Sequence, residues 1–160
     1  MSYILLMSRA FVKQDAEEAF EDLPERPVSE HPNYVTPVGL SLIEAELTRL
    51  SKEHATAVAA SNRESLARTA RDLRYWTARR ASAQLIPPPT DCSHVRFGCT
   101  VTLGRDDGRR QTFRIVGEDE ADPAKGTLSH VSPLARALMG RKVGDVVPAG
   151  RDEAEILAIG

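Results

Sequence analysis

Two apolar heptad patterns that follow each other closely constrain the fold of this chain more than any other feature of its sequence. Thr36-Pro37 is typical of a helix start, because threonine accepts a hydrogen bond at the N-cap and proline fits the first helical position. A seam of side chains then recurs at steps of three and four residues, namely Leu40, Ile43, Leu47, Leu50, His54 and Ala57. This spacing predicts a long helix with an apolar stripe, which His54 interrupts.

A second helix follows after a short turn. The sequence Ser61-Asn62-Arg63-Glu64 indicates a capping box, in which the serine and the glutamate satisfy backbone N–H groups of the first turn. The same seam spacing continues through Leu66, Thr69, Leu73, Trp76, Arg80 and Ala83. Because the connection is short, the two helices must pack antiparallel. We predict a coiled-coil hairpin over residues 36–86, with arms of roughly 20 residues, about 30 Å long.

An acidic, proline-containing lead precedes the hairpin, over residues 1–35. Acidic side chains outnumber basic ones in it, and Pro24, Pro27 and Pro32 exclude one long helix. Two interpretations stay open: a solvated flexible tail, or a segment that docks on a basic surface of a partner. Met7 is a candidate start of the chain beside Met1.

The tripeptide Pro87-Pro88-Pro89 is a stiff spacer that predicts a boundary, after which residues 90–160 form a separate domain. Alternating apolar side chains over residues 95–103 predict a half-buried strand, and a second strand at 112–116 follows a turn. Further strands are expected at residues 127–131, 146–147 and 155–159. We predict a small antiparallel sheet.

The segment 132–145 predicts the one short helix of this domain. Ser132 can cap the helix, Pro133 fits its first position, and Gly140 tolerates the left-handed conformation that closes it. Packing this helix on the sheet gives an α+β fold.

Composition excludes several classes of function. The formal net charge of −2 argues against a protein that coats nucleic acid through a positive field. No apolar run reaches the roughly 18 residues of a membrane span. The sequence also lacks a nucleophile elbow and a glycine-rich phosphate loop. We therefore expect a cytoplasmic binding module with no catalytic residue, no cofactor, no membrane contact and no small-molecule substrate.

Cys92 and Cys99 are the two cysteines of the chain. Together with His94 they fall short of the four ligands of a structural zinc site. We expect two reduced thiols, with Cys99 buried in a strand, as a reducing cytoplasm favours. The acidic loop 117–123 lacks the spacing of a calcium loop, so we expect no metal site.

The C-terminal part of the chain carries a string of motifs that resembles the bacterial Gre transcript-cleavage factors, GreB more than GreA. The matching residues are Val95, Phe97, Gly98, Val101, Leu103, Asp107, Gly108, 113–117, Glu120, 132–138 and 143–145, with Tyr34, Val35, Thr36, Pro37, Gly39, Glu46 and Leu47 upstream. The resemblance covers roughly residues 34–160. It implies an FKBP-like C-terminal domain, without an isomerase role, behind an N-terminal coiled coil.

The resemblance also implies a partner, RNA polymerase. In this family the C-terminal domain docks near the rim of the polymerase secondary channel, and the coiled coil reaches down the channel toward the active centre. We therefore expect Ser132, Pro133, Leu134 and Arg136 to contact the polymerase. Nucleic acid is then met only indirectly, through the polymerase complex.

The tip of the hairpin departs from the family. Cleavage factors carry two acids, in an Asp-x-Ser-Glu-Asn-like sequence, that help hold a second Mg²⁺ in the polymerase site. Here the tip residues Asn62, Arg63 and Glu64 offer one acid beside a repelling arginine, and the arm is shorter than the family's full-length hairpin. We expect an elongation regulator that does not cleave efficiently and is not itself an enzyme. The alternatives are a Rnk-like regulator of another protein, and a cleavage factor that uses Glu64 with Asp72.

Overall fold

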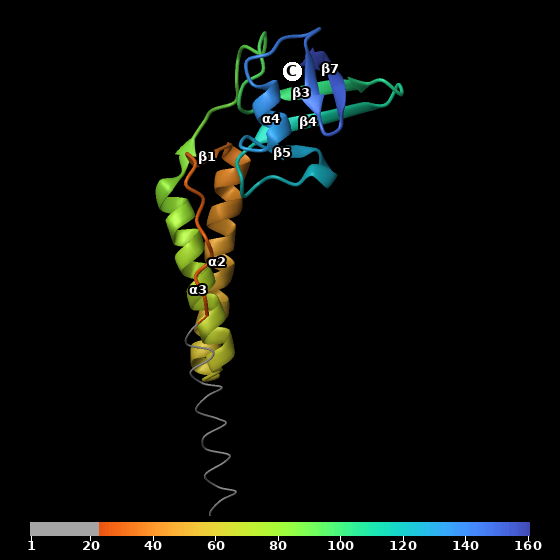
Figure 1. Ribbon diagram of the computed structural model, residues 1–160. Helices are drawn as coiled ribbons and strands as arrows, with labels where there is room; N and C mark the ends of the chain where they lie inside the picture. The colour runs from red at the N-terminus through yellow and green to blue at the C-terminus, as the bar shows by residue number, and fades with distance from the viewer. Residues whose placement is uncertain (1–22) are drawn as a thin grey trace, which may run out of the picture. The chain divides into compact units, whose positions relative to one another are not determined.

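The computed structural model describes residues 23–160 (Figure 1). The predictions about the start of the chain and about the first part of the acidic lead fall on residues 1–22 and lie outside the described residues. Contacts divide the described residues into two units, 23–28 with Glu44–Ala81 and Ser29–Ile43 with Ser82–Gly160. We call them the hairpin unit and the β unit. The predicted domain boundaries stay a prediction.

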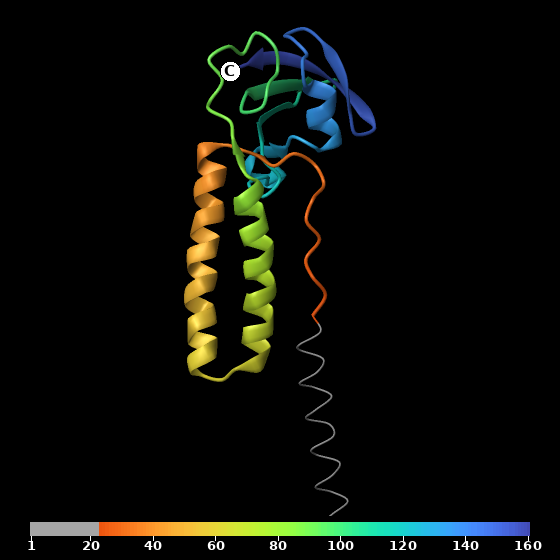
Figure 2. The same cartoon turned by 90° about the vertical axis from the view of Figure 1, so that its left-hand side faces the viewer.

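The predicted helical hairpin is confirmed. Helix α2 spans Pro37–Ala59 and helix α3 spans Arg63–Ser82, with 23 and 20 residues. Figure 2 shows the two helices side by side and antiparallel, joined by a short turn. The start of α2 is the predicted one, because the Thr36 hydroxyl accepts a hydrogen bond from the Gly39 N–H at 2.9 Å.

The β unit is built on a sheet of five strands in the order β5-β4-β3-β7-β6. Their bounds are Thr100–Arg105 for β3, Arg110–Val116 for β4, Thr127–Ser129 for β5, Val146–Ala149 for β6 and Asp152–Ile159 for β7. The predicted α+β class is confirmed, but the sheet is mixed, because β4 and β5 pair in parallel. The connection between these two strands, which contains the 3₁₀ turn Pro123–Lys125, returns the chain so that both strands run the same way.

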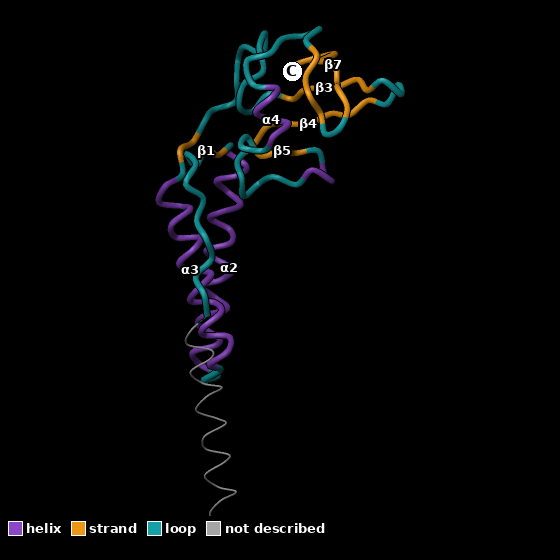
Figure 3. Tube along the Cα trace, in the orientation of Figure 1, coloured by secondary structure: helices purple, strands orange, loops and turns teal. Residues whose placement is uncertain are grey.

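The strand predicted to begin at Val95 begins at Thr100 instead. Gly98, with φ of 88°, takes a left-handed backbone that an extended strand does not accommodate. Figure 3 accordingly draws the long stretch before β3 as loop. Val95 and Cys99 are still buried, at 1% and 0% exposure, so the alternation identified the inward-facing side chains but not their backbone conformation.

One core holds the β unit together. Its side chains come from the sheet and from helix α4, Pro133–Leu138, and the fully buried ones include Val101, Leu103, Ile115, Ala135, Leu138 and Ile156. The predicted short helix is thus confirmed, and it packs by its Ala135 and Leu138 face. Among residues 23–160, no helix is long and apolar enough to cross a membrane.

Residues before α2 complete the β unit. The two-residue strand β1, Tyr34–Val35, pairs in parallel with β2, Gln84–Leu85. The Tyr34 ring packs edge-on against Phe97 and tilted against His130, with centroid distances of 6.0 and 5.3 Å. Gly117 is required here, because a Cβ at this position would lie 2.4 Å from the Tyr34 carbonyl oxygen. The end of the predicted lead is therefore part of a folded unit.

Candidate functional site

The tip of the hairpin is a turn with one cap and one acid. The Ser65 N–H donates to Asn62 Oδ1 at 3.1 Å, so Asn62 is the N-cap of α3. The predicted capping box starting at Ser61 is wrong. Ser61 has φ of 51°, a left-handed backbone that ends the turn after α2, whereas an N-cap residue needs an extended backbone.

Glu64 occupies the first turn of α3 and is exposed, as are Asn62 and Arg63. A carboxylate in this position stabilises the positive N-terminal end of a helix. Asp72, the suggested second acid, lies two turns further along and is paired with Arg26 and Arg71, at 3.5 and 3.3 Å. Within residues 23–160, no group of three or more His, Cys, Asp or Glu side chains is placed to hold a metal ion.

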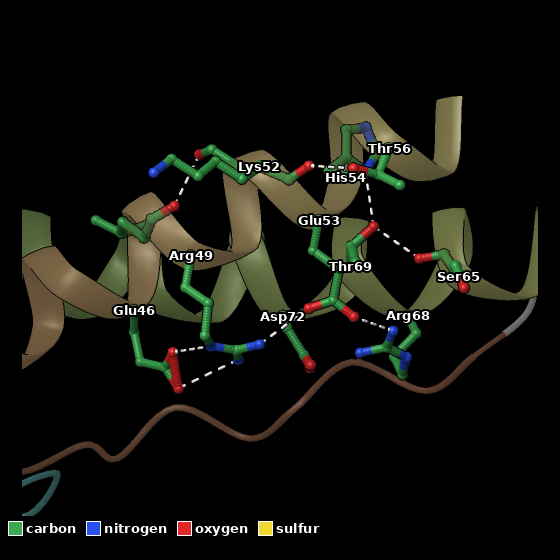
Figure 4. A network of polar contacts seen from close by, with 12 residues as sticks. Glu46, Arg49, Lys52, Glu53, His54, Thr56, Ser65, Arg68, Thr69 and Asp72 are labelled. Carbon is green, nitrogen blue, oxygen red and sulfur yellow. Dashed lines mark hydrogen bonds and ion pairs between the residues drawn. The ribbon is translucent and has the colours of Figure 1, made fainter. Parts of the chain in front are cut away.

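The half of the hairpin nearest the tip is held by polar contacts across its seam (Figure 4). His54 Nδ1 and Thr69 Oγ1 are 2.7 Å apart, and the same hydroxyl lies 2.7 Å from the Ser65 carbonyl oxygen. The Thr69 hydroxyl can both donate and accept, so it links His54 of α2 to the backbone of α3 in either tautomer of the imidazole. The seam position predicted as weak is thus a satisfied polar pair.

An interhelical ion pair lies beside this polar seam. Arg68 of α3 donates to Glu53 of α2, and Arg49 donates to the other Glu53 oxygen at 2.9 Å. The hydrogen bond from Arg68, followed by the charges of both arginines, holds the pKa of Glu53 below its usual range, although burial opposes the shift. The basic character of α3 is therefore partly neutralised within the hairpin.

The described end of the acidic lead lies along α3. Arg74 donates through Nε to both carboxylate oxygens of Glu25, at 2.9 and 3.1 Å. The guanidinium of Arg26 sits 3.9 Å from the centre of the Tyr75 ring and also pairs with Asp72. The sequence left open a solvated flexible tail and a segment that docks on a partner. This part of the lead instead contacts the chain's own basic helix.

Of the four residues predicted to contact a partner, three lie on α4 and Ser132 is its N-cap, and they differ in exposure. Ser132 caps the helix by accepting from the Ala135 N–H at 3.3 Å, and Leu134 packs against the core. Pro133 and Arg136 are exposed. Arg136 Nη2 lies 3.4 Å from His31 Nε2, in the segment before β1. The structure therefore leaves two of the four, Pro133 and Arg136, available for contact.

The segment that follows α4 was not among the residues predicted to contact a partner. It exposes Met139, Val143 and Val146, at 41%, 55% and 54%, and carries the exposed Arg141 and Lys142 between them. Apolar side chains without cover, mixed with basic ones, are typical of a protein-binding surface. A short run that mixes apolar and basic residues, interrupted by Gly140 and Gly144, is the signal that could have identified it. We call Pro133, Arg136 and these five residues the α4 surface.

Three comparisons place these features among known proteins. A family model described as "Transcription elongation factor, GreA/GreB, C-term" matches residues 89–160. Transcription elongation factor GreB of Neisseria meningitidis serogroup B is 38% identical over 157 residues, covering 82% of this chain and 95% of that protein. Transcription elongation factor GreA of Desulfovibrio desulfuricans is 36% identical over 148 residues, covering 89% of this chain and 88% of that protein. Among solved structures, GreA factor homolog 1 of Thermus thermophilus matches with a TM-score of 0.39 and 21% identity, covering 81% of this chain and 99% of that chain.

Proposed function

The chain belongs to the GreA/GreB family of transcription elongation factors, and we propose on that basis that it binds RNA polymerase and acts at the secondary channel. The observation that supports the docking site is the α4 surface, where the exposed Pro133 and Arg136 adjoin uncovered apolar and basic side chains. Ser132 and Leu134 serve this surface indirectly, by capping and anchoring the helix that presents it.

The hairpin is the part of the chain proposed to enter the channel. At 1.5 Å per residue, helices of 23 and 20 residues extend about 30–35 Å. Its turn, with Asn62, Arg63 and Glu64, then faces the polymerase active centre. Access is regulated by occupancy, because an inserted arm excludes other ligands of the same channel.

The chemistry of the tip argues against efficient transcript cleavage. Holding a second Mg²⁺ in the polymerase site takes two carboxylates close together, since Mg²⁺ prefers several oxygen ligands in a tight octahedral arrangement. Glu64 is the one acid of the turn, Arg63 repels a cation, and Asp72 is two turns away in its own ion pairs. We propose a regulator that binds without cleaving and is not an enzyme.

A backtracked polymerase complex tests both parts of the proposal. We expect the protein to bind the complex in the presence of Mg²⁺ without shortening the transcript. The variant Arg63→Glu, which adds a second acid beside Glu64, is expected to produce measurable shortening, whereas the matched control Arg63→Gln is not. Shortening by the unmodified protein that disappears in Glu64→Gln would establish the cleavage alternative instead.

The docking surface has its own test. The double variant Pro133→Ala/Arg136→Ala is expected to weaken polymerase binding at least tenfold while leaving the unfolding temperature nearly unchanged, since both side chains are exposed. Arg151→Ala, which removes an exposed arginine from the turn between β6 and β7, is the matched control and is expected to bind normally. If neither the unmodified protein nor the control binds polymerase, the Rnk-like alternative applies and the β unit serves a different protein partner.

A further inference from the structure

The two cysteines of the chain meet in the β unit. Cys92 Sγ and Cys99 Sγ are 2.7 Å apart, and both are free thiols. A covalent S–S bond is about 2.05 Å long, so the sulfur atoms need only a small further approach to bond. The cysteines are seven positions apart in sequence, and neither takes part in the surfaces proposed to contact the polymerase.

The fold itself brings the thiols together, because the loop that carries them is fixed at several backbone positions. The Val95 N–H donates to the Arg141 carbonyl at 2.8 Å, and the Gly140 N–H donates to the Val95 carbonyl at 2.9 Å. On the other side, the Gly98 N–H donates to the Ile115 carbonyl at 2.8 Å. The loop is thus attached to the end of α4 and to β4, and its two ends converge at the cysteines. This arrangement preorganises the pair before any bond forms.

The two thiols have unequal surroundings. Cys99 is fully buried, at 0% exposure, and burial followed by the contact with Cys92 raises the pKa of its thiol to about 11. It is therefore a protonated, shielded thiol at neutral pH. Cys92 is half-buried and can be reached from solvent. Such a pair, with an accessible attacking thiol and a shielded partner in contact with it, is the arrangement of a thiol that oxidises and a thiol that resolves the product.

We propose that Cys92 and Cys99 are a modification site, at which a peroxide converts the two thiols into a reversible disulfide. The Cys92 thiolate attacks one peroxide oxygen, so that an S–O bond forms, the O–O bond breaks and the departing oxygen leaves as water after taking up a proton. The Cys99 sulfur then attacks the Cys92 sulfur, the S–S bond forms, and the Cys92 oxygen leaves as a second water with the Cys99 proton. The thiols lose two electrons, which reduce hydrogen peroxide to two waters, and a dithiol reverses the reaction.

The disulfide would close the loop that carries Phe97. The Phe97 ring contacts Tyr34 and His130, with centroid distances of 6.0 and 5.6 Å. It therefore joins the loop to β1 and to the residue that follows β5. Cross-linking a loop removes conformations from the unfolded chain and stabilises the folded one when geometry permits. Oxidation is therefore expected to raise the unfolding temperature of the β unit. This effect does not depend on polymerase binding.

The full-length protein treated with a small excess of hydrogen peroxide tests the proposal. We expect a mass loss of about 2 Da, for two hydrogen atoms, at a rate independent of protein concentration, followed by full reversal with dithiothreitol. The peptide that contains residues 92–99 should carry the cross-link. The unfolding temperature of the oxidised protein should rise by several degrees and return on reduction.

Two variants separate the roles of the cysteines. Cys99→Ala should leave Cys92 as a sulfenic acid that dimedone traps, with no mass loss. Cys92→Ala should react far more slowly, because the remaining thiol is buried. The proposal is overturned if peroxide takes Cys92 of the unmodified protein to sulfinic acid, or into a dimer between chains, while Cys99 stays open to alkylation after unfolding.

Discussion

The β unit and the hairpin unit use different forces to hold their shape. The β unit buries a cluster of apolar side chains from all five strands of its sheet and from α4, several of them at 0% exposure. In the described part of the hairpin unit, the buried apolar side chains are Leu50 and Ala57, accompanied by the buried Thr69 and Arg79. Ion pairs and a polar seam supply much of the remaining contact between its segments. Burial fixes the β unit, whereas polar contacts fix the hairpin.

This difference suits the proposed roles of the two units. A docking domain needs a rigid frame for its contact surface, and a close-packed apolar core provides one. An arm of two helices has one seam and little interior, and a polar pair within such a seam fixes its register at a cost in stability. His54 and Thr69 occupy that position. We therefore expect the distal hairpin to open locally more often than the sheet does.

The largest expected effect comes from the core of the β unit. Leu103, on the central strand β3, is fully buried, so Leu103→Ala should lower the free energy of unfolding by about 2–5 kcal/mol. Amide hydrogen exchange of β3 and β7 measures the loss directly. Val146→Ala, at a half-exposed position of the same sheet, should change stability by less than about 0.5 kcal/mol. The fluorescence of Trp76, the single tryptophan, reports the hairpin unit; an equal shift there would mean that both units unfold together and would break the comparison.

A smaller effect is expected at the polar seam of the hairpin. Thr69→Val keeps the shape of the side chain but removes the hydroxyl that is hydrogen-bonded to His54 Nδ1. Leaving the half-buried His54 Nδ1 without its hydrogen-bond partner should cost about 1 kcal/mol. Thr77→Val, an exposed threonine on the same helix, is the matched control and should cost little. Trp76 fluorescence during urea unfolding separates the two variants, and equal midpoints would show that the seam pair contributes nothing.

Local signals made the helices predictable. Thr36-Pro37 and the seam spacing fixed the start of α2, and Ser132-Pro133 fixed the start of α4, because caps and apolar periods act within a few residues. Caps and spacing did not decide which residues in and after α4 are buried and which are exposed. Ala135 and Leu138 are buried while Met139 is 41% exposed, because exposure after α4 depends on how the sheet ends and cannot be derived from spacing.

Contacts between distant parts of the chain could not be predicted from the sequence. Strand β1 exists because Tyr34 and Val35 meet Gln84 and Leu85, about 50 positions away. The parallel β4–β5 pairing depends on the path of an irregular loop. The cap of α3 was missed for a subtler reason: Ser61 and Asn62 can both cap a helix, and the left-handed turn at Ser61 decides between them.

The cap of α3 gives the next prediction. Asn62→Ala removes the acceptor of the Ser65 N–H and should destabilise the hairpin by about 0.5–1 kcal/mol, without effect on the β unit. Ser61→Gly should act in the opposite direction by about 0.5 kcal/mol, because glycine adopts a left-handed backbone freely. Hydrogen exchange at the start of α3 measures both. Destabilisation by Ser61→Gly would indicate that the serine side chain, rather than the asparagine, caps the helix.

The smallest expected effect is that of acid, which should destabilise the hairpin at a higher pH than the sheet. Hydrogen bonds from Arg74 and Arg68 hold the pKa values of Glu25 and Glu53 below the ordinary value of 4.5. Because the folded pKa is the lower one, the stabilisation is present above about pH 4.5 and is lost as the pH falls through the folded value. Both pairs are exposed to solvent, which screens them. Unfolding of the hairpin, followed by Trp76 fluorescence, should thus become easier between pH 5 and 3 by a small amount.

The variants Glu25→Gln and Glu53→Gln should flatten this pH dependence, while Glu64→Gln, at the exposed tip, should not. The β unit also has acids of lowered pKa, Asp91 and Asp107, but backbone N–H groups of Ser93 and Arg109, two residues away, are the main cause. Contacts between residues two positions apart stabilise a single turn. They do not connect separate segments of the chain. Glu25 and Glu53, in contrast, join the lead to α3 and α2 to α3. A pH dependence of equal size in β3 exchange would therefore contradict the division between a unit held by burial and a unit held by charge.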